Sequence, residues 1–321
     1  MNQLSTTESG TGAADATISR WLGIYAQLTK ARLSVLVLWT TAVGYLLATQ
    51  WSLSVDAARF IFTVVGTALA AGCANTLNQV LEIDRDARMP RTQDRPLPRG
   101  VVSVRHSVAV ALALGVSGVV ILALGANVFA ATLAALTIVV YVAIYTPLKV
   151  HSSLNTLVGA ICGAIPPMIG WVAATGRLDG GAWALGGLLF VWQLPHFLAL
   201  AWLYRDDYAR GDFAMLPRFD ATGRQTAQIV VLTSLMLIPL SLSVTLLGLA
   251  GWIFTIGAVV LGVWMTGRAL RMLRARTDTN ARGVFVASLV YLSMVLLLLV
   301  LDRGPITPEL PTHRLAAAET F

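Results

Sequence analysis

The chain has 321 residues, of which 56% are hydrophobic and only 12% are charged, and its mean hydropathy is +0.73. This composition excludes an ordinary soluble domain and indicates an integral membrane protein. The net charge of +7 could suggest a nucleic-acid ligand, but in a membrane protein the basic residues report first on topology.

The N-terminal segment is polar and rich in Ser, Thr, Gly and Ala, and it lacks the charged start and apolar core of a cleavable signal. We predict a disordered cytoplasmic tail over residues 1–28. A single intramembrane domain is expected over 29–303, followed by a C-terminal tail over 304–321.

Apolar segments of the length that a helix needs to cross a bilayer follow one another along the chain. They lie near residues 33–49, 60–79, 105–126, 128–146, 155–175, 182–203, 226–248, 251–270 and 284–301. We therefore predict an all-α, polytopic bundle of about nine transmembrane helices. The boundary at residues 125–128 stays open, because only Asn127 marks a turn and a long helical hairpin is an equal interpretation.

Basic residues are distributed unevenly between the two ends of these segments. With the N-terminus inside, the inner segments collect 19 of the 23 Lys and Arg residues, and only Arg59, Arg177, Arg303 and Arg314 fall outside. Because cytoplasmic loops carry the excess of basic residues, the asymmetry predicts an odd number of spans with the N-terminus and the charged loops cytoplasmic. The basic charge thus reflects topology, and no nucleic-acid partner is predicted.

The inner loop after the second span contains carboxylates that topology alone does not require. Residues 78–98, NQVLEIDRDARMPRTQDRPLP, hold four carboxylates and four arginines. Asn78, Glu82 and Asp86 recur at four-residue steps, so they would stack on one face if the preceding helix continues through them. Oxygen ligands of this kind suit magnesium.

A second inner loop, after the sixth span, has the same mixed character. Residues 204–217, YRDDYARGDFAMLP, offer Arg205, Asp206, Asp207, Arg210 and Asp212. Carboxylates beside arginines suit a magnesium-bridged diphosphate, and the membrane scaffold suggests a lipid tail between the helices. The two loops are four spans apart, which suggests two similar halves that form one site. The plainer alternative is a solvated, self-neutralising cap at each helix end.

The first motif, N-x3-E-x3-D followed by M-x-R-T-x2-R-P-L-P, resembles the aspartate-rich motif of the UbiA-type intramembrane prenyltransferases. Further similar segments follow in order: TKAR at 29–32, YTPLK at 145–149, NT at 155–156, GAIPP at 163–167, GW at 170–171, WQLPHF at 192–197, YRDDY at 204–208 and MLP at 215–217. The segment 192–197 with 204–208 is the most specific, and it resembles the members of the family that farnesylate haem.

The resemblance implies a reaction in which the farnesyl group of farnesyl diphosphate joins a vinyl group of haem b with addition of water, giving haem O and diphosphate for haem-copper oxidases. It also implies a central cavity open to the cytoplasmic side, Mg²⁺ as cofactor and a bacterial inner membrane whose lipid surrounds the helices. Whether a haem A synthase binds the protein stays open.

Site roles also follow from the resemblance. Magnesium would be held by Asn78, Glu82, Asp86 and Asp207, which with His196 form the expected catalytic group. The candidates for binding the diphosphate are Lys30, Arg32, Arg91, Arg95, Lys149 and Arg205.

His196 is the residue expected to distinguish haem from other acceptors. It lies ten residues before the Asp206–Asp207 pair, about 15 Å deeper in a continuous helix. An imidazole inside a membrane can bind haem iron or shuttle a proton. The alternative is a neutral histidine that is hydrogen-bonded to a neighbouring helix.

Two departures from the family pattern leave alternatives open. Many UbiA-type enzymes have an aspartate in place of Glu82, and another in place of Gly211, so the ligands of the second motif stay open among Asp206, Asp207 and Asp212. Prenyl transfer to a quinone precursor or a chlorophyll-type acceptor would use the same magnesium motif. A transporter with ionisable loops is a third possibility, although the clustering of charge at one face argues against it.

Overall fold

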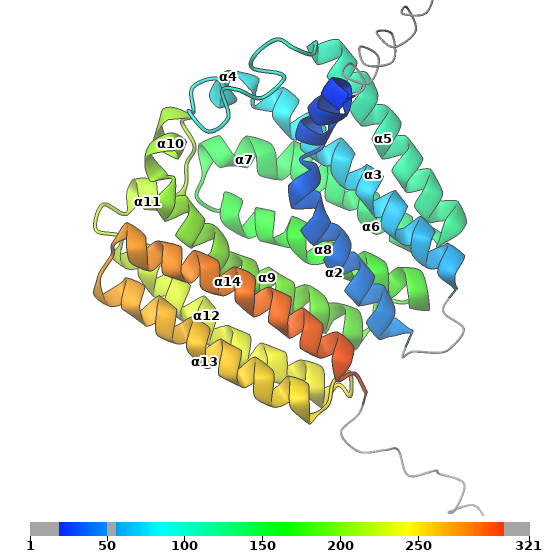
Figure 1. Cartoon of the computed structure of the whole chain (residues 1–321), viewed down its shortest axis with the longest axis vertical. Coiled ribbons are helices and arrows are strands. Elements are labelled where there is room, and N and C mark those ends of the chain that lie inside the picture. Colours follow the sequence, from blue (N-terminus) through cyan, green and yellow to red (C-terminus); the bar gives the residue numbers. More distant parts are fainter. Residues whose placement is uncertain (1–18, 50–55, 305–321) are drawn as a thin grey trace, which may run out of the picture.

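The computed structural model describes residues 19–49 and 56–304, and within them all regular structure is helical apart from a single β-bridge between Ala250 and Arg303 (Figure 1). The long elements are α2 (Ala31–Ala48), α3 (Ala57–Leu81), α5 (Val104–Gly125), α6 (Val128–Val139), α8 (Asn155–Thr175), α9 (Gly180–Leu203), α12 (Arg224–Leu246), α13 (Trp252–Arg274) and α14 (Asp278–Leu301). Short helices lie between them: α4 (Ile83–Asp86), α7 (Thr146–His151), α10 (Arg205–Arg210) and α11 (Leu216–Phe219).

Nine helical segments of the described chain are long and apolar enough to cross a membrane, which confirms the predicted all-α bundle. The fifth, α8, coincides with the predicted range 155–175. The largest difference is the start of α14, predicted at residue 284 and found at Asp278. There the hydroxyl of Thr277 accepts the Asn280 N–H at 3.3 Å, so a capped polar turn extends the helix beyond its apolar segment.

The third and fourth spans are separate helices. Asn127 begins α6, and its side-chain oxygen accepts the Ala130 N–H at 2.8 Å. Its amide nitrogen donates to the Val172 carbonyl at 2.9 Å, which ties this turn to the end of α8. Residues 125–128 therefore contain a capped turn between two spans, and not the middle of one long helix.

The fourth span is continuous from Val128 to His151 although it contains Pro147. Proline lacks the N–H and crowds the carbonyl four residues earlier, so it usually kinks a helix. Here a π-helical segment, Val140–Tyr145, comes directly before the proline-containing turn and widens the helix. Lys149, two residues after Pro147, lies on the inner side of the bundle.

The helices α2 and α8 pack closely where a glycine of one helix faces the backbone of the other. A Cβ placed on Gly44 of α2 would fall on the Pro167 carbonyl of α8, and one on Gly170 of α8 would fall on the Thr41 carbonyl of α2. Contact between small residues of this kind is how helices associate in a bilayer, where the hydrophobic effect does not bring them together.

Residues 19–28 correct the predicted tail. The prediction covered 1–28, of which 1–18 lie outside the described residues, but residues 19–28 form a helix. Ile24 and Leu28 are buried in a cluster with Leu97 and Val102 of the loop after α3. Ile24 and Leu28 are four residues apart, so they lie on one face of the helix and this face can be buried.

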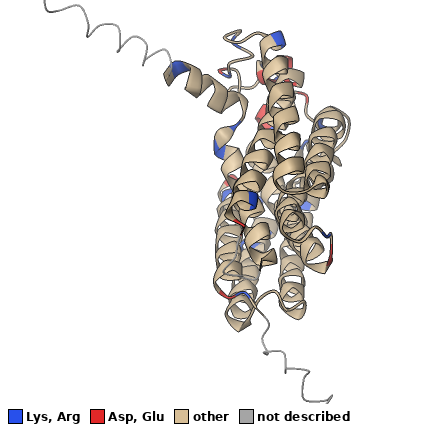
Figure 2. Cartoon of the chain, turned by 90° about the vertical axis from the view of Figure 1, so that its right-hand side faces the viewer, with Lys and Arg blue, Asp and Glu red and all other residues tan. Residues whose placement is uncertain are grey.

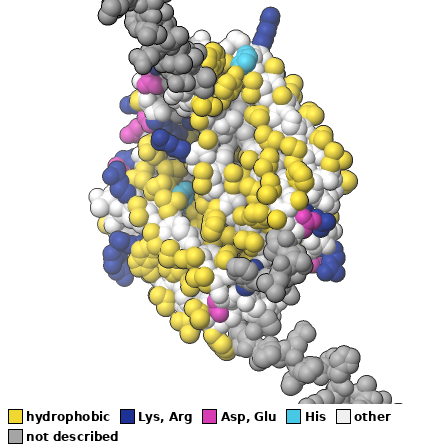
Figure 3. All heavy atoms as spheres, turned by 45° about the vertical axis from the view of Figure 1, so that its right-hand side comes forward, with side chains coloured by type: hydrophobic (Ala, Val, Ile, Leu, Met, Phe, Trp, Pro, Cys, Tyr) yellow, Lys and Arg dark blue, Asp and Glu magenta, His cyan; other side chains and the backbone are white. Residues whose placement is uncertain are grey.

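Charge and hydropathy divide the surface. The α4 and α10 loops lie at the same end of the bundle in Figure 1, and Figure 2 shows Asp and Glu together with Lys and Arg near that end. Hydrophobic side chains cover most of the middle of the face in Figure 3. Large apolar residues such as Leu124 and Leu246 are 84% and 86% exposed. This pattern is that of a bundle in a bilayer with a charged rim.

Candidate active site

The first motif spans the end of α3 and the short helix α4, so its oxygen-bearing side chains lie inside the charged end of the bundle. Asn78, Glu82 and Asp86 are all buried, with exposed fractions of 0%, 5% and 1%. Glu82 and Asp86 line a cavity of about 300 Å³. The predicted four-residue spacing therefore places two carboxylates on one cavity wall.

The lining of the cavity consists of a charged and polar part and an apolar and aromatic part, which contact each other. Its polar and charged lining comes from Lys30, Glu82, Asp86, Arg91, Thr92, Arg95, Lys149, Asn155 and Thr156. Its apolar and aromatic lining comes from Leu33, Met89, Tyr141, Tyr145, Phe197, Leu200, Ala201, Tyr208, Phe213 and Met215. Four basic and two acidic side chains thus face one space, and this excess of positive charge favours an anion.

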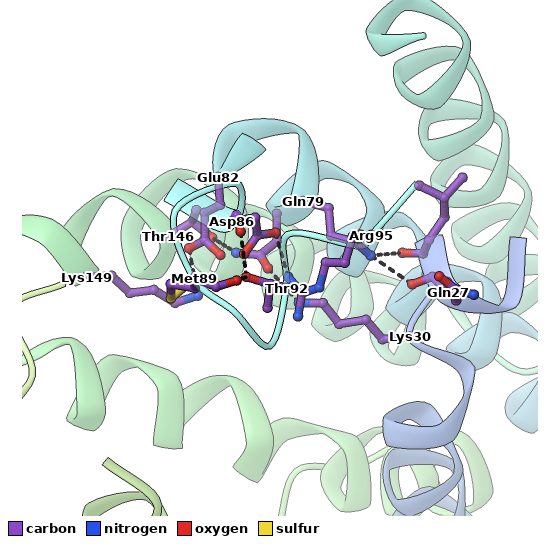
Figure 4. Close-up of polar contacts among 12 residues, drawn as sticks. Gln27, Lys30, Gln79, Glu82, Asp86, Met89, Thr92, Arg95, Thr146 and Lys149 are labelled. Atoms are coloured by element: carbon purple, nitrogen blue, oxygen red, sulfur yellow. Dashed lines mark hydrogen bonds and ion pairs between the residues drawn. The ribbon is translucent and has the colours of Figure 1, made fainter. Parts of the chain in front are cut away.

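Each oxygen-bearing residue of the first motif has a basic partner (Figure 4). Lys149 Nζ lies 2.8 Å from Glu82 Oε1, and Arg95 Nη1 lies 2.6 Å from Asp86 Oδ2. Lys30 Nζ donates to Asn78 Oδ1 at 2.6 Å. In Figure 4 the two carboxylates lie between Lys149 on one side and Arg95 and Lys30 on the other, so charges of both signs are interleaved.

Burial and like charge shift the protonation of Lys30. Burial, together with repulsion by Lys149 and Arg95, lowers the pKa of this amine to about 7. Burial raises the pKa of Asp86, although Arg95 acts in the opposite direction. An anionic ligand at this end of the cavity would stabilise the charged form of Lys30.

The first motif also fits a magnesium ion. Asp86 Oδ1 is buried and has no hydrogen-bond partner within the described part of the chain, and a bound cation would satisfy it. In the same residues no group of three or more His, Cys, Asp or Glu side chains is close enough to hold a metal. Mg²⁺ commonly takes one or two carboxylates and completes its shell with water and phosphate oxygens, so the donor set is compatible with it.

The loop after α9 completes the charged rim from the other half of the chain. Arg88 Nη1 lies 2.7 Å from Asp212 Oδ2, and the Arg91 guanidinium lies over the rings of Tyr204 and Tyr208 at 4.8 and 4.3 Å. These contacts bring together the two loops that the sequence predicts to share a site.

Five of the predicted site residues do not line the cavity: Arg32, Asn78, His196, Arg205 and Asp207. Arg205 Nη1 lies 2.7 Å from Asp278 Oδ1, so this guanidinium is directed to the start of α14. The reason is the turn at Tyr204, where α9 ends and α10 begins with a new direction. Asp207 is paired with Arg210 at 3.2 Å, and Arg32 is exposed.

His196 lies between α9 and α14 and does not line the cavity, although the next residue, Phe197, does. Its Nδ1 is 2.8 Å from Ser288 Oγ, and its ring stacks with Trp192 and Phe285 at centroid distances of 5.1 and 4.9 Å. Sequence reasoning identified no role for Phe285 or Ser288, because the last three spans contain no recognisable motif.

Tyr141 and Tyr145 were also missed, although their four-residue spacing beside the YTPLK segment was a usable signal. Both line the cavity, and their rings lie 5.1 Å apart. Lys149 Nζ is 4.6 Å from the centre of the Tyr145 ring, so an aromatic wall adjoins the charged part.

The sequence of the chain is similar to those of a known protein family. Residues 37–299 match the UbiA prenyltransferase family. The protoheme IX farnesyltransferase of Solibacter usitatus (strain Ellin6076) is 41% identical over 286 residues, which cover 87% of this chain and 98% of that protein. The protein of that name from Anaeromyxobacter sp. (strain Fw109-5) is 44% identical, with 85% and 91% covered. The mitochondrial protein of Arabidopsis thaliana is 41% identical, with 87% and 64% covered.

Solved structures support the same fold. A structure of digeranylgeranylglyceryl phosphate synthase superposes with a TM-score of 0.74 at 14% identity, covering 88% of this chain and 98% of that one. A UbiA homologue from Archaeoglobus fulgidus bound to DMAPP and Mg²⁺ has a TM-score of 0.60 at 13% identity, with 86% and 99% covered. With these relatives, the matched family region and the helical bundle in agreement, this chain belongs to the UbiA prenyltransferase family.

Proposed function

We propose that the chain transfers the farnesyl group of farnesyl diphosphate to a vinyl group of haem b, with addition of water, to give haem O and diphosphate. The observation that carries this assignment is the 41–44% identity to protoheme IX farnesyltransferases over most of the chain. The mixed lining of the cavity supports it, because a lipid diphosphate needs charged side chains for its head and apolar side chains for its chain in one space.

The charged part of the cavity would bind the diphosphate. Arg91 and Arg95 offer guanidinium N–H groups, which suit phosphate oxygens, and Lys30 and Lys149 add two ammonium charges. As the bond from the allylic carbon to the diphosphate oxygen breaks, the negative charge of the leaving group grows, and these preorganised charges stabilise it.

Magnesium at this site would supply further neutralisation of the leaving group. Asp86 is the first candidate to hold it, because its Oδ1 is unpartnered, and Glu82 shares the same wall. Asn78 and Asp207 remain predicted ligands, and Asp207 would have to leave Arg210 to take part.

The apolar part of the cavity would hold the farnesyl chain and shelter the reacting carbon from water. Leu33, Phe197 and Leu200 form part of this lining, and so do the rings of Tyr141 and Tyr145, the second of which lies 4.6 Å from Lys149 Nζ. An aromatic face attracts positive charge, so Tyr145 could stabilise the cationic carbon that forms as diphosphate departs. The vinyl group of haem b then attacks that carbon, and water adds to the resulting cation.

The proposed setting is a bacterial inner membrane, with the charged rim on the cytoplasmic side, where farnesyl diphosphate is soluble enough to reach the basic residues. The acceptor is proposed to approach along α9, where His196 lies deeper in the bundle than the rim.

The test is to incubate the purified protein in detergent with haem b, farnesyl diphosphate and Mg²⁺, with a chelator control, and to analyse extracted haem by mass spectrometry. A magnesium-dependent product that carries farnesyl plus water is the expected result. Unmodified haem with farnesyl diphosphate still bound would overturn haem as the acceptor and direct the search to quinone precursors or chlorophyll-type acceptors. Failure to bind farnesyl diphosphate would overturn prenyl transfer itself.

A further inference from the structure

Ser288 of α14 makes three hydrogen bonds, two through its hydroxyl and one through its backbone carbonyl. Its side chain is fully buried. Its hydroxyl donates to the Phe285 carbonyl at 2.6 Å, and its own carbonyl accepts the indole N–H of Trp192 at 2.7 Å. The third contact is between Ser288 Oγ and His196 Nδ1, at 2.8 Å.

These contacts determine where the proton of a neutral His196 must lie. A serine hydroxyl has one proton, and the Phe285 carbonyl can only accept. Both contacts of Ser288 Oγ are therefore hydrogen bonds at once only if it donates to that carbonyl and accepts from the imidazole. Nδ1 of His196 must therefore carry the proton. In a neutral ring the other nitrogen, Nε2, then has a free lone pair.

The surroundings of the ring leave that lone pair accessible. Trp192 and Phe285 stack with the imidazole at interplanar angles of 22° and 28°, so these two neighbours occupy ring faces. Phe197 is tilted by 56°, with its ring centroid 5.7 Å away. Over residues 19–49 and 56–304, Nε2 has no hydrogen-bond partner, and His196 is only partly buried whereas Ser288 is sealed. The Nδ1 edge of the ring is thus used for orientation, and the Nε2 edge has no partner among the described residues.

We propose that Ser288 is a positioning residue that holds His196 with its proton on Nδ1, so that Nε2 can bind the iron of a haem acceptor. A histidine that binds a metal through one nitrogen commonly donates the other N–H to a fixed acceptor, which orients the ring. The proposal rests on the proposed haem-farnesylating function, because it assumes an acceptor that contains iron.

The test uses ferric haem b and the purified full-length protein in detergent, without farnesyl diphosphate. Titration followed in the Soret band gives the affinity for haem and reports histidine ligation. Ser288→Ala should weaken haem binding by about 10-fold, the lower end of the loss typical for a residue that orients a metal ligand. His196→Ala should lose the ligation band, and added imidazole should restore it.

Matched variants separate orientation from packing. Ser234→Ala removes another fully buried helical hydroxyl, which donates to the Val230 carbonyl, and it should titrate like the wild type. Ser288→Cys keeps the shape of the side chain with a somewhat larger atom but provides only a weak hydrogen-bonding group, so it should shift the titration in the same direction as Ser288→Ala. Unchanged binding of farnesyl diphosphate shows that each variant is folded.

The outcomes are distinct from those of the farnesylation assay. If Ser288→Ala and Ser288→Cys titrate like the wild type, or if the wild type shows no histidine ligation band, the inference is overturned even where haem O is made. If Ser288→Ala and Ser288→Cys bind haem more weakly than the wild type and Ser234→Ala, but no farnesylated haem forms, the positioning role stands and the proposed reaction fails.

Discussion

The two carboxylate oxygens of Asp86 have different surroundings. Oδ2 accepts an ion-paired hydrogen bond from Arg95 at 2.6 Å, whereas Oδ1 is buried and has no partner in the described part of the chain. An unsatisfied buried oxygen costs stability, and proteins retain such groups where a ligand satisfies them. At the scale of single residues, this oxygen is the strongest sign of a cation site.

Asp86→Asn should reduce kcat for farnesyl transfer by at least about 100-fold, as expected when a group that acts on the leaving-group charge is lost. Asparagine keeps the shape of the side chain, so the thermal unfolding temperature in detergent should change little. Asp84→Asn is the control, because Asp84 is an exposed carboxylate in the same short helix and should leave kcat unchanged. Equal activity of the two variants would remove Asp86 from the site.

At the scale of helices, the contact between α2 and α8 depends on the absence of side chains. Gly170 lies so close to the Thr41 carbonyl that no Cβ fits unless the helices separate. This contact holds the first span against α8 and α9. These two spans are the most buried of those described, because 72% of the most apolar stretch of each is buried inside the bundle.

Gly170→Ala should lower the free energy of unfolding by about 1–3 kcal/mol, the usual cost of overpacking. Gly267→Ala is the matched control, because a Cβ there meets nothing within 4 Å on the exposed side of α13. Alanine is the better helix former by about 1 kcal/mol, so the control should be slightly stabilised. Thermal unfolding in detergent measures both, and a stable Gly170→Ala protein would show that the helices can separate without cost.

The start of α12 depends on an aspartate that lies outside the helix. Asp220 Oδ2 accepts the Thr226 N–H at 2.8 Å, and Oδ1 accepts the Thr222 hydroxyl at 3.2 Å. Burial alone would raise the pKa of Asp220, but the hydrogen bonds from Thr226, Thr222 and Gly223 outweigh it and lower the pKa below its usual range.

Asp220→Ala should destabilise the protein by about 1 kcal/mol at pH 7, as the loss of a helix cap does. Because the pKa is lower in the folded state, this contribution is fully present above the unfolded value of about 3.9 and is lost as the pH falls through the folded value. The difference in unfolding temperature between the variant and the wild type should therefore shrink below pH 4. Asp94→Ala, at an exposed aspartate, should show no such difference at either pH.

At the scale of the whole molecule, the site is a junction between two halves. One apolar core lies mainly among α9, α12, α13 and α14, and another lies among α3, α5, α6 and α8. Both halves send a charged loop to the same end of the bundle, where Arg88 and Asp212 join them. The cavity thus lies at the charged end of the bundle, between the two loops. This arrangement is expected of an enzyme that takes a charged substrate from the cytoplasm.

Single cysteines can test that orientation, because Cys73 and Cys162 are buried and should not react. Arg177→Cys lies between α8 and α9 and should be labelled by an impermeant maleimide on spheroplasts. Arg99→Cys, in the loop after α3, should be labelled only after permeabilisation. Both positions are exposed, so they differ only in the side of the membrane they face. The opposite labelling pattern would invert the proposed topology.

The sequence predicts most of the fold because the bilayer imposes a local requirement. Each span must satisfy its own backbone hydrogen bonds over the thickness of the membrane, so a run of apolar residues marks a helix without reference to any other segment. The prediction fails only where polar residues extend a helix, as at the start of α14, or where a short apolar pair forms a helix outside the bundle, as at residues 19–28.

Part of the candidate site is predictable for the same reason. Glu82 and Asp86 share a wall because they are four residues apart, and Lys30, Arg91, Arg95 and Lys149 lie in segments that resemble the family motifs. Arg205 was misplaced because its direction depends on Asp278, which is 73 residues away in the sequence.

The sequence by itself therefore determined the membrane location, the number of spans, the charged end of the bundle and the family. Only the tertiary structure decided which cation faces which carboxylate, that Arg205 and Asp207 do not line the cavity, and that Ser288 orients His196. The physical reason is range: hydropathy and helical period act over a few turns, whereas a pair such as Ser288 and His196 exists only once α14 has packed against α9.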